Sequence, residues 1–291
     1  MWKFGLLDRD FTYKKFHDGL WSTHAGGTRK KIGHADVVIN VIDFRQEYPQ
    51  AVVKQALAAL GFTEQANQLK HVSYGVVSLS PETAAGLGID ISSGKHAYAM
   101  SGRQGIGIKV AELVEHMEQI IEAKRSRKVG ISSRVLAAAA IRYYLLKVNI
   151  QTEVVFDLQQ ATEVSGNSGI YLLYSYARAN RVLANAVKHQ LIVDTTTPIN
   201  LAELEPQEYE LLRHIAYWEE TFEAALKQLT PHVLCSYAFE LASLFSHFYG
   251  ACPIIKGPEN KLQLRLWLTS RFKETLHQVL QVLGMPTPKR M

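Results

Sequence analysis

Residues 166–186, GNSGIYLLYSYARANRVLANA, place tyrosines and arginines on an otherwise apolar stretch with the periodicity of a helix. If the helix begins near Ser168, one face carries small and apolar side chains at the spacing of a core stripe: Leu173, Ala177, Asn180 and Ala184. A neighbouring face carries aromatic rings beside a guanidinium: Tyr171, Tyr174, Arg178 and Val182. The stretch therefore predicts an amphipathic helix that packs in a helical bundle.

The second face has two interpretations. Aromatic rings beside a guanidinium can hold unpaired bases by stacking and by phosphate contact. Half-buried tyrosines that pack with their rings and leave their hydroxyls in water give the same pattern. On the pattern alone we favour packing.

Length and charge set the wider frame. A chain of 291 residues favours two domains, and its 47% hydrophobic content is enough to bury a full core. The net charge of +5 and a pI near 9.0 favour a polyanionic partner such as nucleic acid. Basic residues gather at 124–128 (KRSRK) and between Pro253 and Met291, although a solvated face would give the same clusters.

The sequence gives no sign of a CxxC motif, a secretory signal, a membrane span or a metal site. Cys235 and Cys252 form no CxxC pair and indicate buried free thiols in a reducing compartment. The start of the chain is too charged for a secretory signal, and the apolar run VLAAAAI is stopped by Arg142. The 11 histidines show no metal-ligand spacing, so we expect no metal site. We expect a soluble, cytoplasmic protein with no membrane span.

The chain divides into two halves. Residues 36–61 read as a strand, a polar loop and a helix, residues 71–80 as another strand, and residues 110–123 as an amphipathic helix. Beyond residue 130 almost every segment has helical period, as in the stripe formed by Leu211, Ile215, Trp218, Phe222, Leu226 and Leu229. We predict an α/β domain over residues 1–129 and an all-α bundle over residues 130–291.

A glycine-rich loop, YAMSGRQGIGIKV, lies at residues 98–110 near the end of the first half. Its backbone amides and its two cations, Arg103 and Lys109, would suit a phosphate group. The spacing is neither that of a P-loop nor that of GxGxxG, and a plain turn fits the loop equally well.

The segment GNSGIYLLYSYAR closely resembles the core motif of the helical, DALR-type anticodon-binding domain of arginyl-tRNA synthetases. Further segments resemble the same family in order along the chain: LAAAAIRYYLLK, VVFDLQQATE, LFSHFYGACPII and the terminal GMPTPKRM. Upstream, VIDFRQEYPQ and YAMSGRQGIGIK resemble the end of the catalytic domain of this class I family. The resemblance implies a remnant of the nucleotide-binding domain followed by an all-α anticodon-binding bundle.

The catalytic half departs from the family pattern. The family's HIGH-type motif does not occur in this sequence, and Gly102 and Gln104 stand where the KMSK-type signature loop often has lysines. The resemblance implies that a remnant of the ATP-phosphate loop is formed by Ser101, Gly102, Arg103, Gly105 and Lys109. Adenylate formation needs charge stabilisation on both sides of the triphosphate, so we expect no arginyl-adenylate from this chain alone. We expect no cofactor in this chain, whereas full-length relatives use ATP.

The resemblance reverses the preference between the two interpretations of the tyrosines. It implies an anticodon-binding surface made by Tyr174, Arg178, Tyr249, Arg290 and Met291. The tyrosines would stack on bases, Arg178 would meet a phosphate or a base edge, and the terminal methionine would cover a base face. Arg290, with Lys289, would attract the RNA backbone, and Tyr171 is a second choice.

Three functions follow. The first, which we favour, is the region of an arginine–tRNA ligase, or of a shortened paralogue, that binds the anticodon of tRNA(Arg). The second is a subunit that completes an aminoacylation site with a separate catalytic chain. The third is an interaction module that kept the fold and does not bind tRNA. We expect a monomer.

Overall fold

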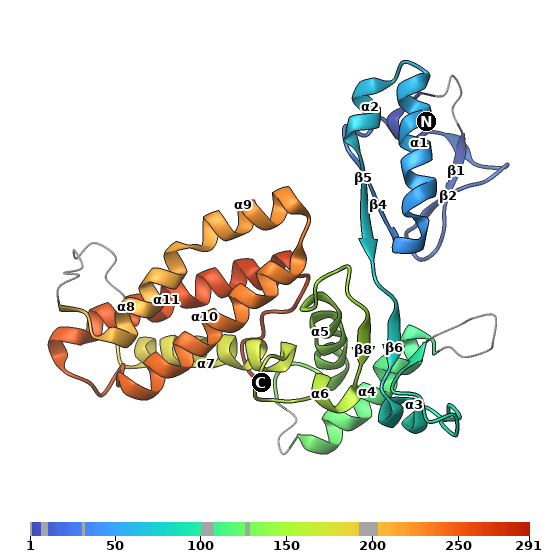
Figure 1. The fold of residues 1–291 in the computed structure, drawn as a ribbon. Helices are drawn as coiled ribbons and strands as arrows, with labels where there is room; N and C mark the ends of the chain where they lie inside the picture. The colour runs from blue at the N-terminus through green and yellow to red at the C-terminus, as the bar shows by residue number, and fades with distance from the viewer. Residues whose placement is uncertain (1, 7–10, 31–32, 100–107, 126–128, 192–202) are drawn as a thin grey trace. The chain divides into compact units, whose positions relative to one another are not determined.

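The computed structural model describes all residues except 1, 7–10, 31–32, 100–107, 126–128 and 192–202. The chain forms two compact units, Met1–Gly75 and Val76–Met291, each with its own secondary structure (Figure 1). The predicted order, an α/β part followed by a helical bundle, is confirmed. The predicted boundary at residues 129 and 130 remains a prediction.

The first unit holds a small antiparallel sheet and a strand–helix–strand segment. The sheet has the order β2-β1-β3, with β1 at Thr12–Lys15, β2 at Trp21–Thr23 and β3 at Thr28–Arg29. A short 3-10 helix, η1, spans Trp2–Phe4. The second segment runs through β4 (Val38–Asp43), η2 (Phe44–Gln46), α1 (Glu47–Ala59), α2 (Thr63–Gln68) and β5 (Leu69–Tyr74). The strand–loop–helix predicted for residues 36–61 corresponds to β4, η2 and α1.

The single strand expected at residues 71–80 is two strands in two sheets. β5 pairs in parallel with β4, whereas β6 (Val77–Leu79) pairs with β7 (Tyr98–Ala99) and with β8 (Val154–Phe156). The buried Gly75 lies between the two strands, at the end of the first unit. The apolar positions change here from even (Val72, Tyr74, Val76) to odd (Val77, Leu79), but the unbroken run of strand-favouring residues was read as one strand.

The core of the second unit extends across residue 130. It begins with β6, α3 (Pro81–Gly86), β7, α4 (Val110–Lys124), α5 (Ser133–Leu146), β8 and α6 (Leu158–Ala161). Met117 and Ile121 of α4 are buried in the same core as Leu136 and Ala140 of α5. Because β6 also pairs with β8, residues on both sides of position 130 share one hydrophobic core.

The remaining helices form a bundle in which α10 packs against the other four. They are α7 (Gly169–Lys188), α8 (Pro206–Ala216), α9 (Trp218–Gln228), α10 (Pro231–Ala251) and α11 (Glu259–Val282). The stripe predicted between Leu211 and Leu229 is divided by the break between α8 and α9 at Tyr217. Leu211 is buried, whereas Leu226 is 60% exposed. The periodicity was therefore correct for α8 and wrong at the end of α9, where the Leu226 side chain is mostly exposed.

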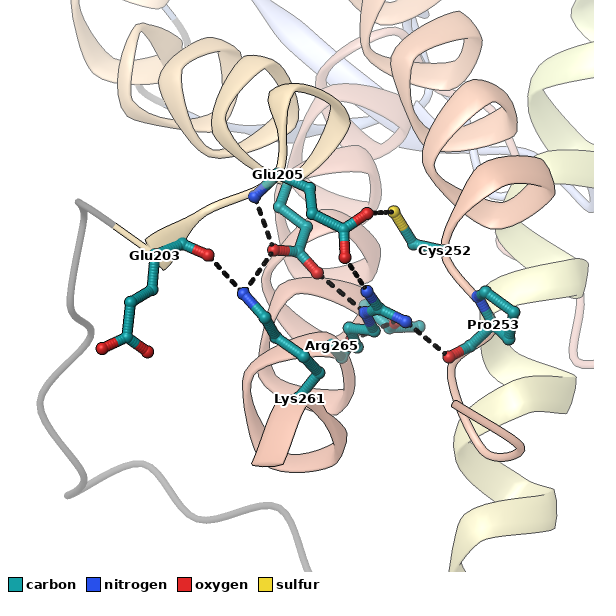
Figure 2. Close-up of polar contacts among 8 residues, drawn as sticks. Glu203, Glu205, Cys252, Pro253, Lys261 and Arg265 are labelled. Carbon is teal, nitrogen blue, oxygen red and sulfur yellow. Dashed lines mark hydrogen bonds and ion pairs between the residues drawn. The ribbon is translucent and has the colours of Figure 1, made fainter. Parts of the chain in front are cut away.

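A buried ion-pair network joins the start of α8 to α11 (Figure 2). The Arg265 guanidinium donates from Nε to Glu208 Oε1 at 2.7 Å and from Nη2 to Glu205 Oε1 at 2.6 Å. Its Nη1 donates to the Pro253 carbonyl at 3.0 Å, in the loop between α10 and α11. Lys261 Nζ lies 3.5 Å from Glu208 Oε2. Arg265 and Lys261 therefore belong to the interior, although the sequence placed them in a basic cluster that could be solvated.

The network sets the charge state of Glu208. Burial opposes ionisation, but hydrogen bonds from Arg265 and from the Glu205 N–H, together with the nearby positive charges, hold the pKa of Glu208 below its usual value. The same Glu208 carboxylate caps the first turn of α8 by accepting from the Glu205 N–H at 3.0 Å. One ionised carboxylate thus serves both the ion pair and the start of the helix.

Both cysteines are buried free thiols, as predicted. Burial raises the pKa of Cys235 to about 12 and, with the nearby Glu205 charge, raises the pKa of Cys252 to about 11.

In the described part of the chain, no helix has both the length and the apolar character needed to cross a membrane.

Glu208→Gln should lower the free energy of unfolding by up to about 3–5 kcal/mol at pH 7, because it removes the fully buried carboxylate that pairs with Arg265 and Lys261 and leaves Arg265 with only the part-exposed Glu205. Urea unfolding followed by circular dichroism measures this loss. The matched control is Glu274→Gln, which removes an exposed pair with Arg271 at 3.0 Å and should cost less than about 1 kcal/mol. Equal losses in the two variants would contradict the assigned role of the buried network.

The loss should also depend on pH. Because the folded-state pKa of Glu208 is lowered, its ionised form contributes stability that is fully present above the ordinary value of 4.5. This contribution disappears as the pH falls through the lower folded-state pKa. The difference between the native chain and Glu208→Gln should therefore shrink in acid, and a constant difference would argue against it.

Candidate nucleic-acid interface

Helix α7 starts where the sequence predicts. The Ser168 hydroxyl accepts from the Tyr171 N–H at 3.1 Å and caps the first turn. A Cβ on Gly169 would lie 2.9 Å from Tyr143 Cβ and 3.1 Å from the Ala139 carbonyl oxygen, so glycine allows α7 to approach α5 closely. Leu172 and Leu173 are fully buried. These contacts fix which side of α7 faces outward.

The outward side carries a cluster of two tyrosines and one arginine. The Arg178 guanidinium carbon lies 4.6 Å from the ring centroid of Tyr174, one turn earlier on α7. It also lies 5.1 Å from the ring centroid of Tyr249, on α10. Both rings keep exposed surface, 39% for Tyr174 and 43% for Tyr249. We call Tyr174, Arg178 and Tyr249 the Tyr–Arg cluster.

Packing beneath the cluster holds it in place. Arg178 Nη1 donates to Ser246 Oγ on α10 at 3.4 Å. The Tyr249 ring lies 6.2 Å from that of Phe245, which stacks on Phe272 of α11 at 3.8 Å between centroids. Phe245 and Phe272 are fully buried. The exposed rings therefore stand on a rigid aromatic base, a suitable arrangement for stacking a planar ligand.

Tyr171 belongs to the packing of the bundle. Its hydroxyl donates to the Ala242 carbonyl at 3.3 Å, and its ring lies 5.9 Å from that of Phe239. Both partners lie on α10. The structure therefore favours the packing interpretation for Tyr171. The sequence analysis had kept this residue as a second choice for the anticodon-binding surface.

The exposed side of α7 is positively charged from its middle to its C-terminal end. The helix contains Arg178, Arg181 and Lys188 and no acidic residue. At 100° per residue, all three project within a narrow arc around the direction of Tyr174. None of the three makes an ion pair with a carboxylate in the described part of the chain. Sequence reasoning overlooked Arg181, although its spacing of three residues from Arg178 was a usable signal.

The C-terminal tail lies against another side of α7. The Asn180 side chain donates to the Lys289 carbonyl at 3.1 Å. Asn180 follows Arg178 by two positions on α7, and residues at this spacing on a helix point about 200° apart. A side chain on Gly130 would collide with the Arg290 carbonyl, and Met291 packs partly buried against the core. The tail is thus firmly held. No described contact joins Arg290 or Met291 to the Tyr–Arg cluster.

Most of the predicted remnant of the ATP-phosphate loop lies outside the described residues. Ser101, Gly102, Arg103 and Gly105 of the glycine-rich loop fall outside the described residues. Lys109 directly precedes α4, and its exposed ammonium Nζ lies 3.8 Å from Glu112 Oε1. Among the residues that are described, no group of three His, Cys, Asp or Glu side chains could hold a metal ion.

Comparison with known proteins finds a matching family model and similar curated proteins. The family model for the DALR anticodon binding domain matches residues 172–291. The whole chain aligns with the arginine–tRNA ligase of Pyrococcus abyssi at 33% identity, covering 46% of that enzyme. It aligns with the arginine–tRNA ligase of Thermus thermophilus at 31% identity, covering 48%. The chain spans about half the length of the curated relatives it matches.

The structural comparison agrees. The solved structure of Thermus thermophilus arginyl-tRNA synthetase matches with a TM-score of 0.81 and 28% sequence identity. The match covers 100% of this chain and 47% of the solved one.

The cluster tyrosines should be dispensable for folding. Tyr174→Ala should lower the free energy of unfolding by less than about 1 kcal/mol, because the ring is part-exposed. Tyr143→Ala should cost about 3–5 kcal/mol, because that fully buried side chain would leave a cavity. Thermal and urea unfolding of the two variants measures the contrast. A large loss in Tyr174→Ala would return that residue to the core.

Proposed function

Because the chain carries a DALR anticodon-binding domain and is homologous along its whole length to arginine–tRNA ligases, we propose that it binds the anticodon loop of tRNA(Arg) at the Tyr–Arg cluster. The observation that carries the proposal is the Arg178 guanidinium between the half-exposed rings of Tyr174 and Tyr249. Each ring offers a face to a splayed-out base, an interaction worth about 1–3 kcal/mol. The guanidinium between them supplies the charge for a phosphate or a base edge.

The rest of the exposed surface supplies electrostatic attraction. Arg181 and Lys188 extend the positive charge along α7 with no acidic residue to offset it. Arg290 and Met291 form a second contact on the C-terminal tail, where Arg290 meets the RNA backbone and Met291 covers a base face. The tail's backbone contacts support this role, because a fixed segment loses little entropy when RNA binds.

The chain alone is proposed not to aminoacylate. Its glycine-rich loop offers Arg103 and Lys109 on one side of a triphosphate, and the sequence contains no HIGH-type motif for the other side. ATP is used by the full-length enzymes of the family. A second candidate function, a subunit that completes a catalytic site with a separate chain, is favoured by the exposed apolar side chains of Ile39 and Val41 on β4 in the first unit. We propose a monomer in the absence of such a partner.

Replacing a cluster ring should weaken binding without unfolding the chain. Tyr249→Ala should reduce tRNA(Arg) affinity by about 1–3 kcal/mol, whereas Tyr249→Phe should cost much less because the ring face remains. Filter binding at fixed salt measures the affinity, and a thermal melt of each variant checks the fold. Tyr209→Ala is the matched control, because Tyr209 is 48% exposed on α8 and no described contact joins it to the Tyr–Arg cluster. Equal losses in Tyr249→Ala and Tyr209→Ala would contradict the assigned site.

A cation beside the cluster should change the salt dependence. Arg181→Gln should flatten the slope of log affinity against log salt by about 0.7–0.9, the contribution of one phosphate contact. Lys227→Gln, at the end of the acidic helix α9, should leave the slope unchanged. The slope is measured by titrating tRNA(Arg) at several salt concentrations. An unchanged slope in Arg181→Gln would remove Arg181 from the interface.

A further inference from the structure

A cavity of about 380 Å³ opens at the surface where α8, α9 and α10 meet. This volume lies in the range of cavities that hold small molecules. Its lining includes two residues at the end of α8, the residue between α8 and α9, and three residues of α10: Arg213, His214, Tyr217, Ser236, Tyr237 and Glu240. None of them belongs to the Tyr–Arg cluster.

Two stacked rings form part of the cavity wall and are fixed by the fold. The rings of His214 and Tyr237 lie 4.4 Å apart between centroids, and the Trp218 ring lies 5.5 Å from that of Tyr237. The Tyr237 hydroxyl donates to the His214 carbonyl at 2.9 Å, and His214 Nε2 lies 3.1 Å from the Tyr237 carbonyl oxygen. Because α8 and α10 are tied together at this point, the cavity is formed before any ligand arrives.

The contact with the Tyr237 carbonyl sets the hydrogen-bonding role of the other ring nitrogen. A carbonyl oxygen only accepts, so Nε2 of neutral His214 carries the proton and Nδ1 keeps a lone pair. Nδ1 lies 3.9 Å from Glu240 Oε1, which is also an acceptor. Within the described residues, no hydrogen bond reaches either atom. Two acceptors this close, with no donor between them, suit an ammonium group that can donate to both.

The cavity also contains a positive charge without a partner. Arg213 is exposed, and it forms no ion pair with a carboxylate among the residues that the structure describes. Glu240 is likewise exposed and lies near no cation other than a protonated His214. A ligand of one sign would satisfy only one of these two charges. The lining therefore favours a molecule that carries both an ammonium and a carboxylate.

We propose that this cavity binds a free α-amino acid as its zwitterion. The ammonium group donates to His214 Nδ1 and to Glu240, and the carboxylate accepts from the Arg213 guanidinium. An apolar or aromatic side chain packs on the ring of Tyr217, which is 52% exposed. The site is separate from the Tyr–Arg cluster and does not depend on the binding of tRNA.

The test titrates the full chain with L-phenylalanine, which has both charges and an aromatic ring. Two analogues each lack one charge: phenethylamine has no carboxylate, and hydrocinnamate has no amine. Saturation-transfer difference NMR measures binding at slightly alkaline pH, where an unperturbed imidazole is neutral. We expect saturable binding of L-phenylalanine in the millimolar range. Each analogue should bind at least ~10-fold more weakly, because it leaves one charge of the cavity without a partner.

Matched variants locate the site. Glu240→Gln and Arg213→Gln should each weaken the binding of L-phenylalanine at least ~10-fold. Their controls are Glu223→Gln and Lys227→Gln, which change exposed charges on α9 outside the cavity and should leave the affinity unchanged. Circular dichroism shows whether each variant is folded. The two cavity variants are independent, so one carries the test if the other unfolds.

Three results would overturn the proposal. The first is the absence of saturable binding of L-phenylalanine to the native chain. The second is equal affinity for L-phenylalanine and its two analogues, which would reduce the site to non-specific contact with the aromatic ring. The third is an equal effect of the cavity variants and their controls, which would place the binding elsewhere on the chain.

Discussion

The close approach of α7 to α5 and α10 is the constraint on which the rest of the helical unit depends. Gly169 has no side chain to hold α7 away from Tyr143, and Ser175 and Ala179 are buried small residues farther along the helix. Since one side of α7 must fit these neighbours, the orientation of the opposite side is fixed. Tyr174 and Arg178 therefore emerge beside α10, where Tyr249 completes the cluster.

The buried charges around Arg265 join the start of α8 to α11 and to the loop after α10. Burying an ion pair costs desolvation, so its net contribution to stability is small even though breaking it is expensive. Arg265 binds Glu208 and Glu205 at the start of α8 and the carbonyl of Pro253 before α11. A geometry that satisfies several donors at once selects one arrangement of α8 and α11. We suggest that the network serves the specificity of the fold more than its stability.

Local features could be predicted from the sequence, and contacts between distant segments could not. The start of α7 near Ser168 and the spacing of Tyr174 and Arg178 are properties of one helix, and both were predicted. The position of Tyr249 beside Arg178 depends on how α10 packs against α7, and only the family resemblance indicated it. The interior position of Arg265 was missed because a charged residue is ordinarily solvated, and its carboxylate partners lie more than fifty residues earlier. The break at Gly75 was missed because β5 and β6 follow each other in one run of strand-favouring residues, although the apolar positions change phase between them.

The central claim is that the Tyr–Arg cluster reads unpaired anticodon bases. Fluorescence anisotropy of the full chain with the anticodon stem–loop of tRNA(Arg) tests it most directly. The comparison is the same stem–loop with abasic nucleotides in place of its anticodon bases. We predict that removing a stacked base weakens binding by about 1–3 kcal/mol in the native chain and by much less in Tyr249→Ala. Equal affinity of the native chain for the two stem–loops would contradict the account.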